Sequence, residues 1–185
     1  MTNYFTSDSH FGHARIIELA YRDAFSTVDE MNEGLIERWN SVVQPDDHTY
    51  HMGDFAMGQK ILWPSFRSRL NGTITFTRGN HDTPDDKFLA ALLPGDRVLD
   101  EITTTMNDIV IHMAHAPVGW AEGRRDGHQV ITRAGSGTKA DLYLCGHVHG
   151  QFKVQPDIDV TCVNVGVDQW DMRPITLDEI LACAS

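Results

Sequence analysis

Short runs in which apolar and polar residues alternate recur along the chain and predict β-strands. The runs TNYFTS, HTYHMGD and ITFTRGNHD lie in the first half of the chain. In the second half, RVLDEITTTM and DIVIHMAHA flank Asn107 and Asp108, a polar pair that predicts a β-hairpin turn. DLYLCGHVHG and VTCVNVGVD continue the pattern, so the second half is expected to consist mostly of strands.

Helical spacing of apolar residues replaces the alternation in other segments. The clearest is TVDEMNEGLIERWNSVV, where Thr27 and Glu30 form a capping box. Its apolar positions make one stripe: Val28, Met31, Leu35, Ile36, Trp39 and Val43. HARIIELAYR precedes this helix, Thr83 begins a further predicted helix, and LDEILACA closes the chain as a short one.

The order of these elements predicts the fold class. Helices alternate with strands early in the chain and a strand-rich half follows, which favours an α/β sandwich with mixed sheets. A chain of 185 residues suits one core, so we expect residues 1–185 to form a single domain. The segment 118–139 is rich in glycine and charge without a sustained period and is predicted to be a long loop.

Charge and cysteine content limit the binding partners and the cellular compartment that we expect. The net charge of −11 argues against broad nonspecific binding to DNA or acidic membranes, for which proteins normally use a basic patch. A short or local nucleic-acid contact stays open. The three cysteines are an odd number and the chain opens without an apolar leader, so we expect a cytoplasmic protein with free thiols. Cys145 and Cys162 lie in apolar runs and are expected to be buried.

Polar clusters follow the strand-like runs at five places. Their members are Asp8 and His10, Asp54, Asn80 and His81, His115, and His147 and His149. Because ligands gather at the carboxyl ends of strands in open α/β sheets, we expect these clusters to converge. Their nitrogen and oxygen donors suit divalent cations such as Mn²⁺, Fe²⁺, Ni²⁺ or Zn²⁺, and they outnumber the ligands that one tetrahedral ion needs. The sequence therefore predicts a centre with two metal ions.

Each of these residues also has a structural explanation when it is taken alone. A lone histidine is usually a surface or core residue, and Asn80 and Asp82 are common turn residues. The five clusters together favour a functional site. Three histidines fall outside the pattern: His13 is interpreted as a surface or site-edge residue, and His51 and His112 are expected to pack or to support the site without binding metal.

The ordered set DxH, GD, GNHD, H and GHxH is similar to the signature of the calcineurin-like metallophosphoesterases and runs from Asp8 to His149. The short chain, with FTSDSHFGH near its start and EMNEGLIERWNSVV after it, resembles the small members without a cap domain that occur in bacteria and phages. The resemblance implies a four-layer αββα sandwich, in which helices flank two mixed sheets and a two-metal site lies at the sheet edges.

The resemblance also implies roles for individual residues. One metal ion would be held by Asp8, His10, Asp54 and His149, and the other by Asp54, Asn80, His115 and His147. Asp54 would therefore bridge the ions. The candidate catalytic residues are His81, Asp54 and Asp82: His81 would donate a hydrogen bond or proton at the substrate phosphate, and Asp82 would orient His81 or cap the following helix. The candidate substrate-binding residues are Asn80, His81, Arg124 and Arg125, although solvated loop charge is the simpler explanation for the two arginines.

The implied reaction is hydrolysis of a phosphate ester with two divalent ions, of which Mn²⁺ is the first choice. Small uncapped relatives tend toward phosphodiesters, so we expect a phosphodiesterase for small or nucleotide-type substrates, cyclic nucleotides included, with a broad phosphomonoesterase as the alternative. GDFAMG lacks the arginine of the GDxxDRG pattern, which argues against a protein phosphatase or a dinucleoside-tetraphosphate hydrolase.

A non-catalytic alternative is a binding scaffold on the same fold, as in the phosphoesterase-like retromer subunit, where metal positions are partly replaced. Every expected position is filled in this chain, which favours the enzyme. We expect no membrane partner and no stable binding of long nucleic acid, and a dimer stays open.

Overall fold

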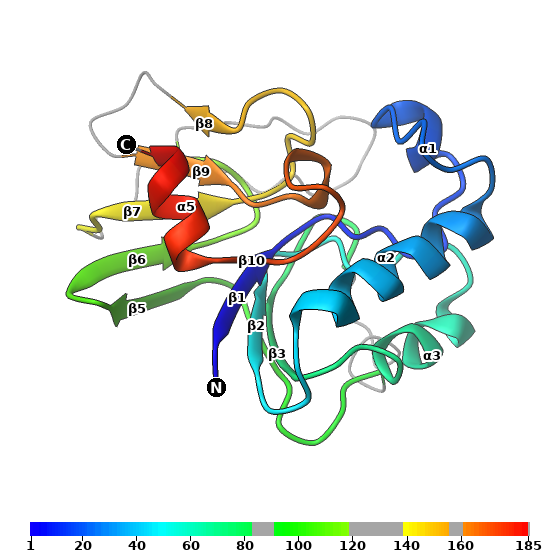
Figure 1. Ribbon diagram of the computed structural model, residues 1–185, viewed down its shortest axis with the longest axis horizontal. Helices are drawn as coiled ribbons and strands as arrows, with labels where there is room; N and C mark the ends of the chain where they lie inside the picture. The colour runs from blue at the N-terminus through cyan, green and yellow to red at the C-terminus, as the bar shows by residue number, and fades with distance from the viewer. Residues whose placement is uncertain (83–90, 119–138, 156–160, 185) are drawn as a thin grey trace.

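The computed structural model describes residues 1–82, 91–118, 139–155 and 161–184 (Figure 1). Within these ranges the strands form two five-stranded sheets. The first sheet has the order β10-β1-β2-β3-β4, with β1 at Asn3–Thr6, β2 at His48–His51, β3 at Thr73–Thr77, β4 at Arg97–Leu99 and β10 at Ile175–Thr176. The second has the order β5-β6-β7-β9-β8, with β5 at Ile102–Met106, β6 at Ile109–Met113, β7 at Leu142–Cys145, β8 at Val154–Gln155 and β9 at Thr161–Asn164.

Strand direction brings several loops to one edge of each sheet. In the first sheet β1 to β4 run parallel, and β10 pairs antiparallel with β1. In the second sheet β6, β7 and β9 run parallel, with β5 and β8 antiparallel at its two edges. Parallel neighbours end at the same edge, so the residues after β1, β2 and β3 lie together, as do those after β6 and β7.

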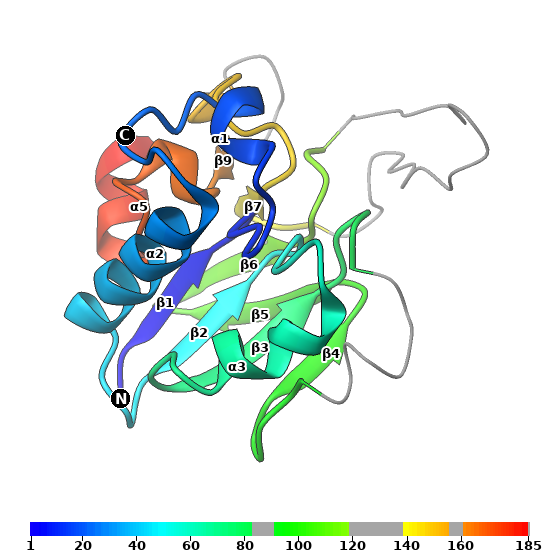
Figure 2. The same cartoon turned by 90° about the vertical axis from the view of Figure 1, so that its right-hand side faces the viewer.

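Two of the described helices cover most of the outer face of the first sheet. The helices are α1 at Ile16–Leu19, α2 at Val28–Val42, α3 at Trp63–Arg67 and α5 at Leu177–Ala184, with short 3-10 turns at Lys60–Leu62 and Val167–Gln169. Figure 2 shows α2 and α3 over β1, β2 and β3. Their buried side chains form one core with the sheet, including Phe11, Met31, Leu35, Trp39, Trp63, Phe66, Ile74 and Phe76.

The predicted capping box at the start of α2 is present in a modified form. Thr27 has an extended backbone and its Oγ1 accepts a hydrogen bond from the Glu30 amide at 3.2 Å. The Glu30 carboxylate accepts from the Ser26 amide at 2.8 Å, one residue before the cap. Two amide donors at the helix start are therefore satisfied, which fixes where α2 begins.

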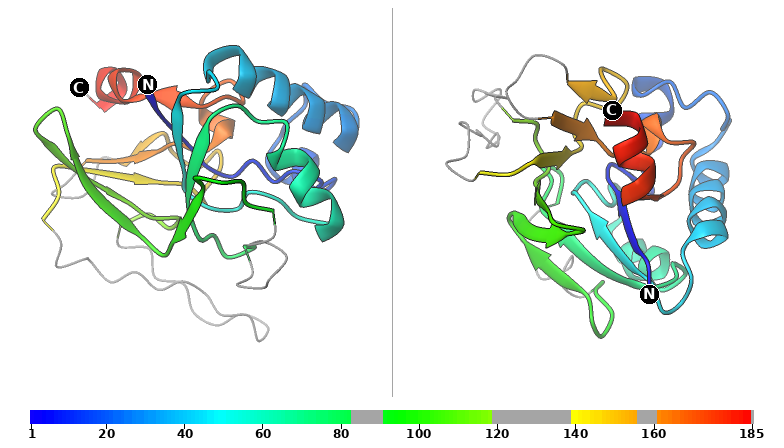
Figure 3. Two further views of the ribbon diagram at one scale, coloured as in Figure 1. Left: turned by 90° about the horizontal axis from the view of Figure 1, so that it is seen from below. Right: turned by 60° about the vertical axis from the view of Figure 1, so that its left-hand side comes forward.

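A second core lies between the two sheets. Phe5 of the first sheet and Met52, which follows β2, pack with Ile111, Met113, Leu144 and Val163 of the second sheet. Leu177 and Ile180 of α5 belong to the same cluster, and α5 contacts β1 and β10 of one sheet and β9 of the other. In the left view of Figure 3 the strands of the second sheet lie on one side of the first sheet, and α2 and α3 lie on the other.

The predicted α/β fold with two mixed sheets is confirmed. Among the described residues, the outer face of the second sheet carries a small cluster of Tyr143, Cys145 and Cys162, against which Val118, Ala140 and Phe152 pack. Cys145 and Cys162 are buried as expected. Within the described ranges no helix has the length and apolar character needed to cross a bilayer.

Some elements differ from the sequence-based expectation. RVLDEITTTM is not one strand, because Arg97–Leu99 pairs with β3 while Ile102–Met106 pairs with β6 in the other sheet. Only Ile16–Leu19 of HARIIELAYR is helical, since Tyr21 adopts a φ of 54° and the Arg22 amide bonds back to the Ile17 carbonyl. The helix predicted after Thr83 and most of the predicted 118–139 loop lie outside the described residues.

The Asn107–Asp108 hairpin is present as expected. Met106 pairs with Ile109, and the two residues between them have φ angles of 51° and 63°. Positive φ at both central residues is the geometry of a type I′ turn, which matches the twist of the flanking strands.

Candidate metal centre

The predicted clusters converge where the parallel strands of both sheets end. Asp8 follows β1, Asp54 follows β2 and Asn80 follows β3, all in the first sheet. His115 follows β6 and His147 follows β7 in the second sheet. The amide of His147 donates to Asp8 Oδ2 at 2.9 Å, so the two sheet edges are joined directly.

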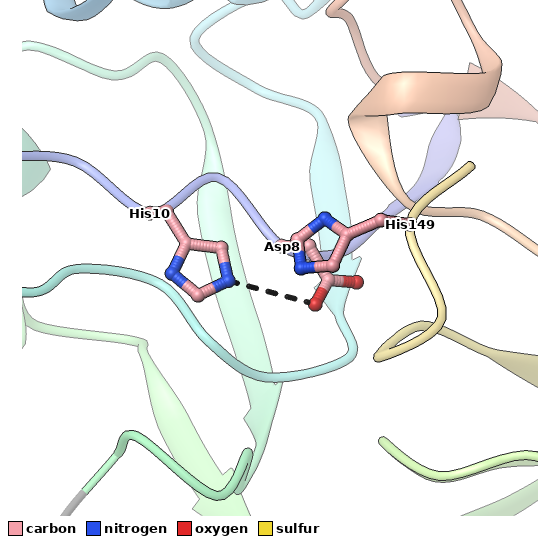
Figure 4. A group of neighbouring side chains, drawn as sticks. All are labelled: Asp8, His10 and His149. Atoms are coloured by element: carbon pink, nitrogen blue, oxygen red, sulfur yellow. Dashed lines mark ion pairs between the residues drawn. The ribbon is translucent and has the colours of Figure 1, made fainter. Parts of the chain in front are cut away.

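The first cluster consists of Asp8, His10 and His149, whose potential ligand atoms lie within 4.8 Å of one another (Figure 4). His10 Nε2 lies 3.9 Å from Asp8 Oδ1. Both atoms are buried and neither has a hydrogen-bond partner within the described part of the chain. Because buried polar atoms are normally satisfied, this convergent pair fits a bound cation.

The second cluster consists of Asp54, His115 and His147, again with potential ligand atoms within 4.8 Å. The Asn80 side chain joins it, since its Oδ1 lies 2.9 Å from His115 Nε2 and 3.0 Å from His147 Nδ1. His115 Nε2 and His147 Nδ1 are 3.2 Å apart. Two imidazoles, an amide oxygen and a carboxylate thus meet at one point, a donor set that suits a divalent transition metal.

Asp54 lies between the clusters. Its Oδ2 is 3.5 Å from His10 Nε2 of the first cluster and 3.4 Å from His115 Nε2 of the second. Its Oδ1 accepts a hydrogen bond from the His81 amide at 2.9 Å, which fixes the carboxylate plane. One oxygen of Asp54 can therefore serve both clusters at once.

Hydrogen bonds behind the ligands select which ring nitrogen faces the site. His115 Nδ1 donates to the Met52 carbonyl at 2.7 Å, so Nε2 is the nitrogen directed at Asn80 and Asp54. His149 Nδ1 lies 2.7 Å from Asp168 Oδ2 and donates to it, which leaves Nε2 for the first cluster. Such partners hold metal-binding histidines in one tautomer and one orientation.

His81 stands beside both clusters without belonging to either. Its Nε2 lies 4.0 Å from Asp54 Oδ2, and its side chain is 37% exposed. Its ring also meets the His10 ring edge-on, with centroids 5.5 Å apart. This position gives the imidazole access to solvent and to a molecule bound over the clusters.

Asp82 braces the backbone, a role that was not expected for it, and the helix that it was expected to cap lies outside the described residues. Its Oδ2 accepts from the amides of Asp54 at 2.7 Å and Gly79 at 2.9 Å, and its Oδ1 accepts from Phe55 at 3.1 Å. The carboxylate therefore ties the turn after β2 to the turn after β3. Both oxygens of Asp82 thus accept from backbone amides, and its described hydrogen bonds include none to the His81 side chain.

The turns that carry the site are strained. Five of its residues have left-handed backbone angles: Asp8, His10, Asp54, His147 and His149. Two glycines allow the turns to approach closely, because a side chain at Gly79 would collide with the Asp54 carboxylate and one at Gly146 with Asp8 and Ser7. Such conformations persist only where the surroundings enforce them, and they concentrate at functional sites.

Burial and mutual charge shift the ionisation of the site. Burial lowers the pKa of His10 well below its ordinary value and raises the pKa of Asp8. Burial opposes charge on Asp54 and His115 as well, but their attraction holds the pKa of Asp54 below its usual range and raises the pKa of His115 to about 10. Burial and the Asp54 carboxylate raise the pKa of Asp82 to about 6. The Asp54 carboxylate thus favours a positive charge beside it.

Two buried residues of the site were not anticipated from the sequence. Arg22 donates from Nε to Asp168 Oδ1 at 2.7 Å and from Nη2 to the Asp8 carbonyl at 2.6 Å. Asp168 in turn accepts from His149. Neither residue lies in one of the short motifs, and their only sequence signal is a charged residue next to an apolar run.

The other histidines and the loop arginines considered in the sequence differ in their position relative to the site. His13 Nδ1 lies 3.4 Å from His10 Nδ1, so this residue is at the edge of the site. His51 Nε2 hydrogen-bonds with Ser9 Oγ at 2.9 Å, between Asp8 and His10, and His112 Nδ1 hydrogen-bonds with Thr103 Oγ1 at 2.8 Å within the second sheet. Both side chains are buried, as expected. Arg124 and Arg125 lie outside the described residues.

Comparison with known proteins links the chain to one family. The family model described as the calcineurin-like phosphoesterase superfamily domain matches residues 1–174. An uncharacterised protein of Methanocaldococcus jannaschii is 44% identical over 87 residues, which are 46% of this chain and 49% of that relative, so the match spans about half of the archaeal protein. The Gene 66 protein of Mycobacterium phage L5 is 26% identical over 200 residues, covering 96% of this chain and 91% of the phage protein.

A solved structure shares the fold. A protein of unknown function from Aquifex aeolicus superposes with a TM-score of 0.73 at 24% identity, and the superposition covers 98% of each chain.

Proposed function

The chain belongs to the calcineurin-like phosphoesterase superfamily, and we propose that it hydrolyses phosphate esters with two divalent metal ions. Family membership and the two candidate metal-binding clusters support metal-dependent phosphoester hydrolysis. One observation carries the proposal: Asp54 Oδ2 lies within 3.5 Å of a histidine nitrogen of each cluster. A carboxylate shared in this way is what a two-metal site requires.

The proposed ligands follow from the two clusters. Asp8, His10, Asp54 and His149 would hold one ion, and Asp54, Asn80, His115 and His147 the other. Their imidazole and oxygen donors suit Mn²⁺, with iron, nickel or zinc as alternatives. When bound, two such ions supply positive charge to the phosphoryl oxygens and lower the pKa of a water molecule.

The remaining chemistry falls to side chains of the chain itself. His81 is proposed to donate a hydrogen bond or a proton to the leaving oxygen, which its exposure and its distance of 4.0 Å from Asp54 support. Asp82 is proposed to act indirectly, by holding the Asp54 and Gly79 turns at a fixed separation.

We propose a phosphodiester as the preferred substrate, either a small diester or a nucleotide-type one. The support is the absence of a GDxxDRG arginine at GDFAMG, which argues against the protein phosphatases and dinucleoside-tetraphosphate hydrolases of this superfamily. A single domain without a separate cap and a cytoplasmic location stay predictions.

The direct test compares two chromogenic esters. Protein loaded with Mn²⁺ is incubated with bis-p-nitrophenyl phosphate and with p-nitrophenyl phosphate, alongside Asp54→Asn. A second variant, Asp96→Asn, changes another aspartate with a buried side chain, which lies just before β4 and pairs with Arg67. We expect metal-dependent release, faster with the diester, that Asp54→Asn abolishes and Asp96→Asn retains.

The outcomes separate the alternatives. Faster release from the monoester would replace the diesterase with a phosphomonoesterase. No metal-dependent release from either ester, by protein that binds metal, would favour the non-catalytic scaffold. A panel of 2′,3′- and 3′,5′-cyclic nucleotides then narrows the substrate class.

A further inference from the structure

A buried ion pair lies directly behind the first cluster, and we propose that it sets the metal affinity of that cluster. Arg22 and Asp168 are joined by two contacts, Nε to Oδ1 at 2.7 Å and Nη2 to Oδ2 at 3.2 Å, and the Arg22 side chain is fully buried. The inference rests on the proposed function, since it concerns how the ligands of that site are held. Both are positioning residues, because Asp168 hydrogen-bonds to the proposed ligand His149 and Arg22 to the backbone that carries Asp8 and His10.

Asp168 positions His149. Its Oδ2 accepts the Nδ1 proton of His149 at 2.7 Å, so the ring presents Nε2 to Asp8 and His10. The backbone of His149 is fixed as well, because its carbonyl accepts from Asn164 Nδ2 and Gln169 Nε2, both at 2.8 Å. Without Asp168 the ring loses the partner that selects its tautomer and its rotation about the side-chain bonds.

Arg22 positions the turn that carries the other two ligands. Its Nη2 donates to the Asp8 carbonyl at 2.6 Å and its Nη1 to the Ser9 carbonyl at 3.0 Å. Asp8 and His10 both have left-handed backbone angles, with φ of 57° and 50°. Two charge-assisted hydrogen bonds to this turn hold it in a conformation that it would otherwise leave. One ion pair therefore organises all three ligands of the first cluster.

The chain contains a second ion pair of the same kind that lies away from the clusters. Arg67 bonds to Asp96 through Nε and Nη2, both at 2.8 Å, and donates to the carbonyls of Leu70 and Gly72. This second pair is equally buried. Asp96 also accepts from the amides of Leu93 and Ile74, and Ile74 lies at the start of β3, whereas Asn80 of the second cluster follows its end. A general loss of stability and a specific loss of metal binding can therefore be separated with matched variants.

The experiment compares Asp168→Asn with Asp96→Asn in the full chain. Mn²⁺ binding is measured by calorimetric titration and by metal analysis after dialysis, and thermal unfolding is recorded in chelator. We expect Asp168→Asn to weaken one of the two Mn²⁺ sites about 10- to 100-fold and to leave the other unchanged. Asp96→Asn should lower the unfolding temperature to a similar degree while retaining the affinity of both sites.

A second variant keeps the test decisive if the unpaired Arg22 charge prevents folding. Arg22→Gln combined with Asp168→Asn removes both charges and is expected to show the same selective loss. Nitrogen NMR of the metal-free protein should also show that His149 no longer carries its proton on Nδ1 alone.

Unchanged Mn²⁺ affinity in the folded single or double variant would overturn the inference, as would equal weakening of both sites or a matching loss in Asp96→Asn. Wild-type protein that binds no divalent ion would instead overturn the proposed function.

Discussion

His81 has a different environment from the six histidine and carboxylate ligand candidates, although it follows Asn80 directly. Its side chain is 37% exposed and belongs to neither cluster, whereas His115 is almost fully buried within one. We expect His81→Ala to retain both metal ions and to lower kcat about 10²- to 10⁴-fold, the range for loss of a general acid or base. Metal analysis and steady-state kinetics on the same preparation check this.

His147→Ala is the matched control for that experiment. His147 contacts Asn80 and His115 within the second cluster, so its removal should reduce metal occupancy as well as turnover. Loss of a metal ion from His81→Ala would contradict the role assigned to His81 and make it a ligand.

Asp82→Asn is expected to destabilise the folded protein. Replacement by Asn puts an amide N–H against one of the backbone donors of Asp54, Phe55 or Gly79. Leaving a buried donor unsatisfied costs about 1–3 kcal/mol, so the free energy of unfolding in chelator should fall by about that amount. Urea unfolding measures it, with Asp100→Asn as control because the Asp100 side chain is 90% exposed. A change of equal size in both variants would show that the bracing contacts are not what stabilises these turns.

The ligand candidates could be predicted because each lies in a short motif after an apolar run. DxH, GD, GNHD and GHxH place their side chains through local turns, so neighbouring sequence carries the information. Arg22 and Asp168 are different, since they meet His149 and the Asp8 carbonyl only after segments distant in sequence have packed together. No local pattern specifies such a contact, and Asp82 likewise gained its role only from the approach of two turns.

Among the secondary-structure elements, α2 can be destabilised by a substitution that should leave the metal centre unchanged. Thr27→Ala removes the oxygen that accepts from the Glu30 amide, and loss of such a cap costs about 0.5–2 kcal/mol. We expect a lower unfolding temperature with unchanged Mn²⁺ affinity and unchanged turnover per folded molecule. Thr27→Ser retains the hydroxyl and should behave like the wild type. A loss of metal binding in Thr27→Ala would mean that α2 and the centre are coupled.

The elements that were predicted well are those with a local signal. α2 has a cap and a continuous apolar stripe, and the Asn107–Asp108 turn has the residues that positive φ favours. The break between β4 and β5 has no such signal, because Arg97–Leu99 and Ile102–Met106 form one strand-like run that only sheet pairing divides. The short strands β8 and β10 are likewise defined by their partners β9 and β1.

At the scale of the whole molecule, the centre joins the two sheets. Asp8, His10, Asp54 and Asn80 follow strands of the first sheet, whereas His115, His147 and His149 follow strands of the second. Each cluster contains at least one side chain that follows a strand of the first sheet and at least one that follows a strand of the second. An ion bound at a cluster would therefore link the sheets at the edge where the strands end, in addition to the apolar core that already joins them.

Metal removal should consequently change global stability as well as activity. A ligand present at 100 times its dissociation constant stabilises the folded state by about 2.7 kcal/mol, which corresponds to about 5–10 °C for a chain of this size. We expect the unfolding temperature in Mn²⁺ to exceed that in chelator by at least this amount when both sites fill. Because Asp54 reaches both clusters, Asp54→Asn should remove most of the difference, whereas Asp96→Asn should lower both temperatures and retain it. Equal unfolding temperatures with and without Mn²⁺ in the wild type would show that the clusters do not bind the ion and would contradict the proposed hydrolase.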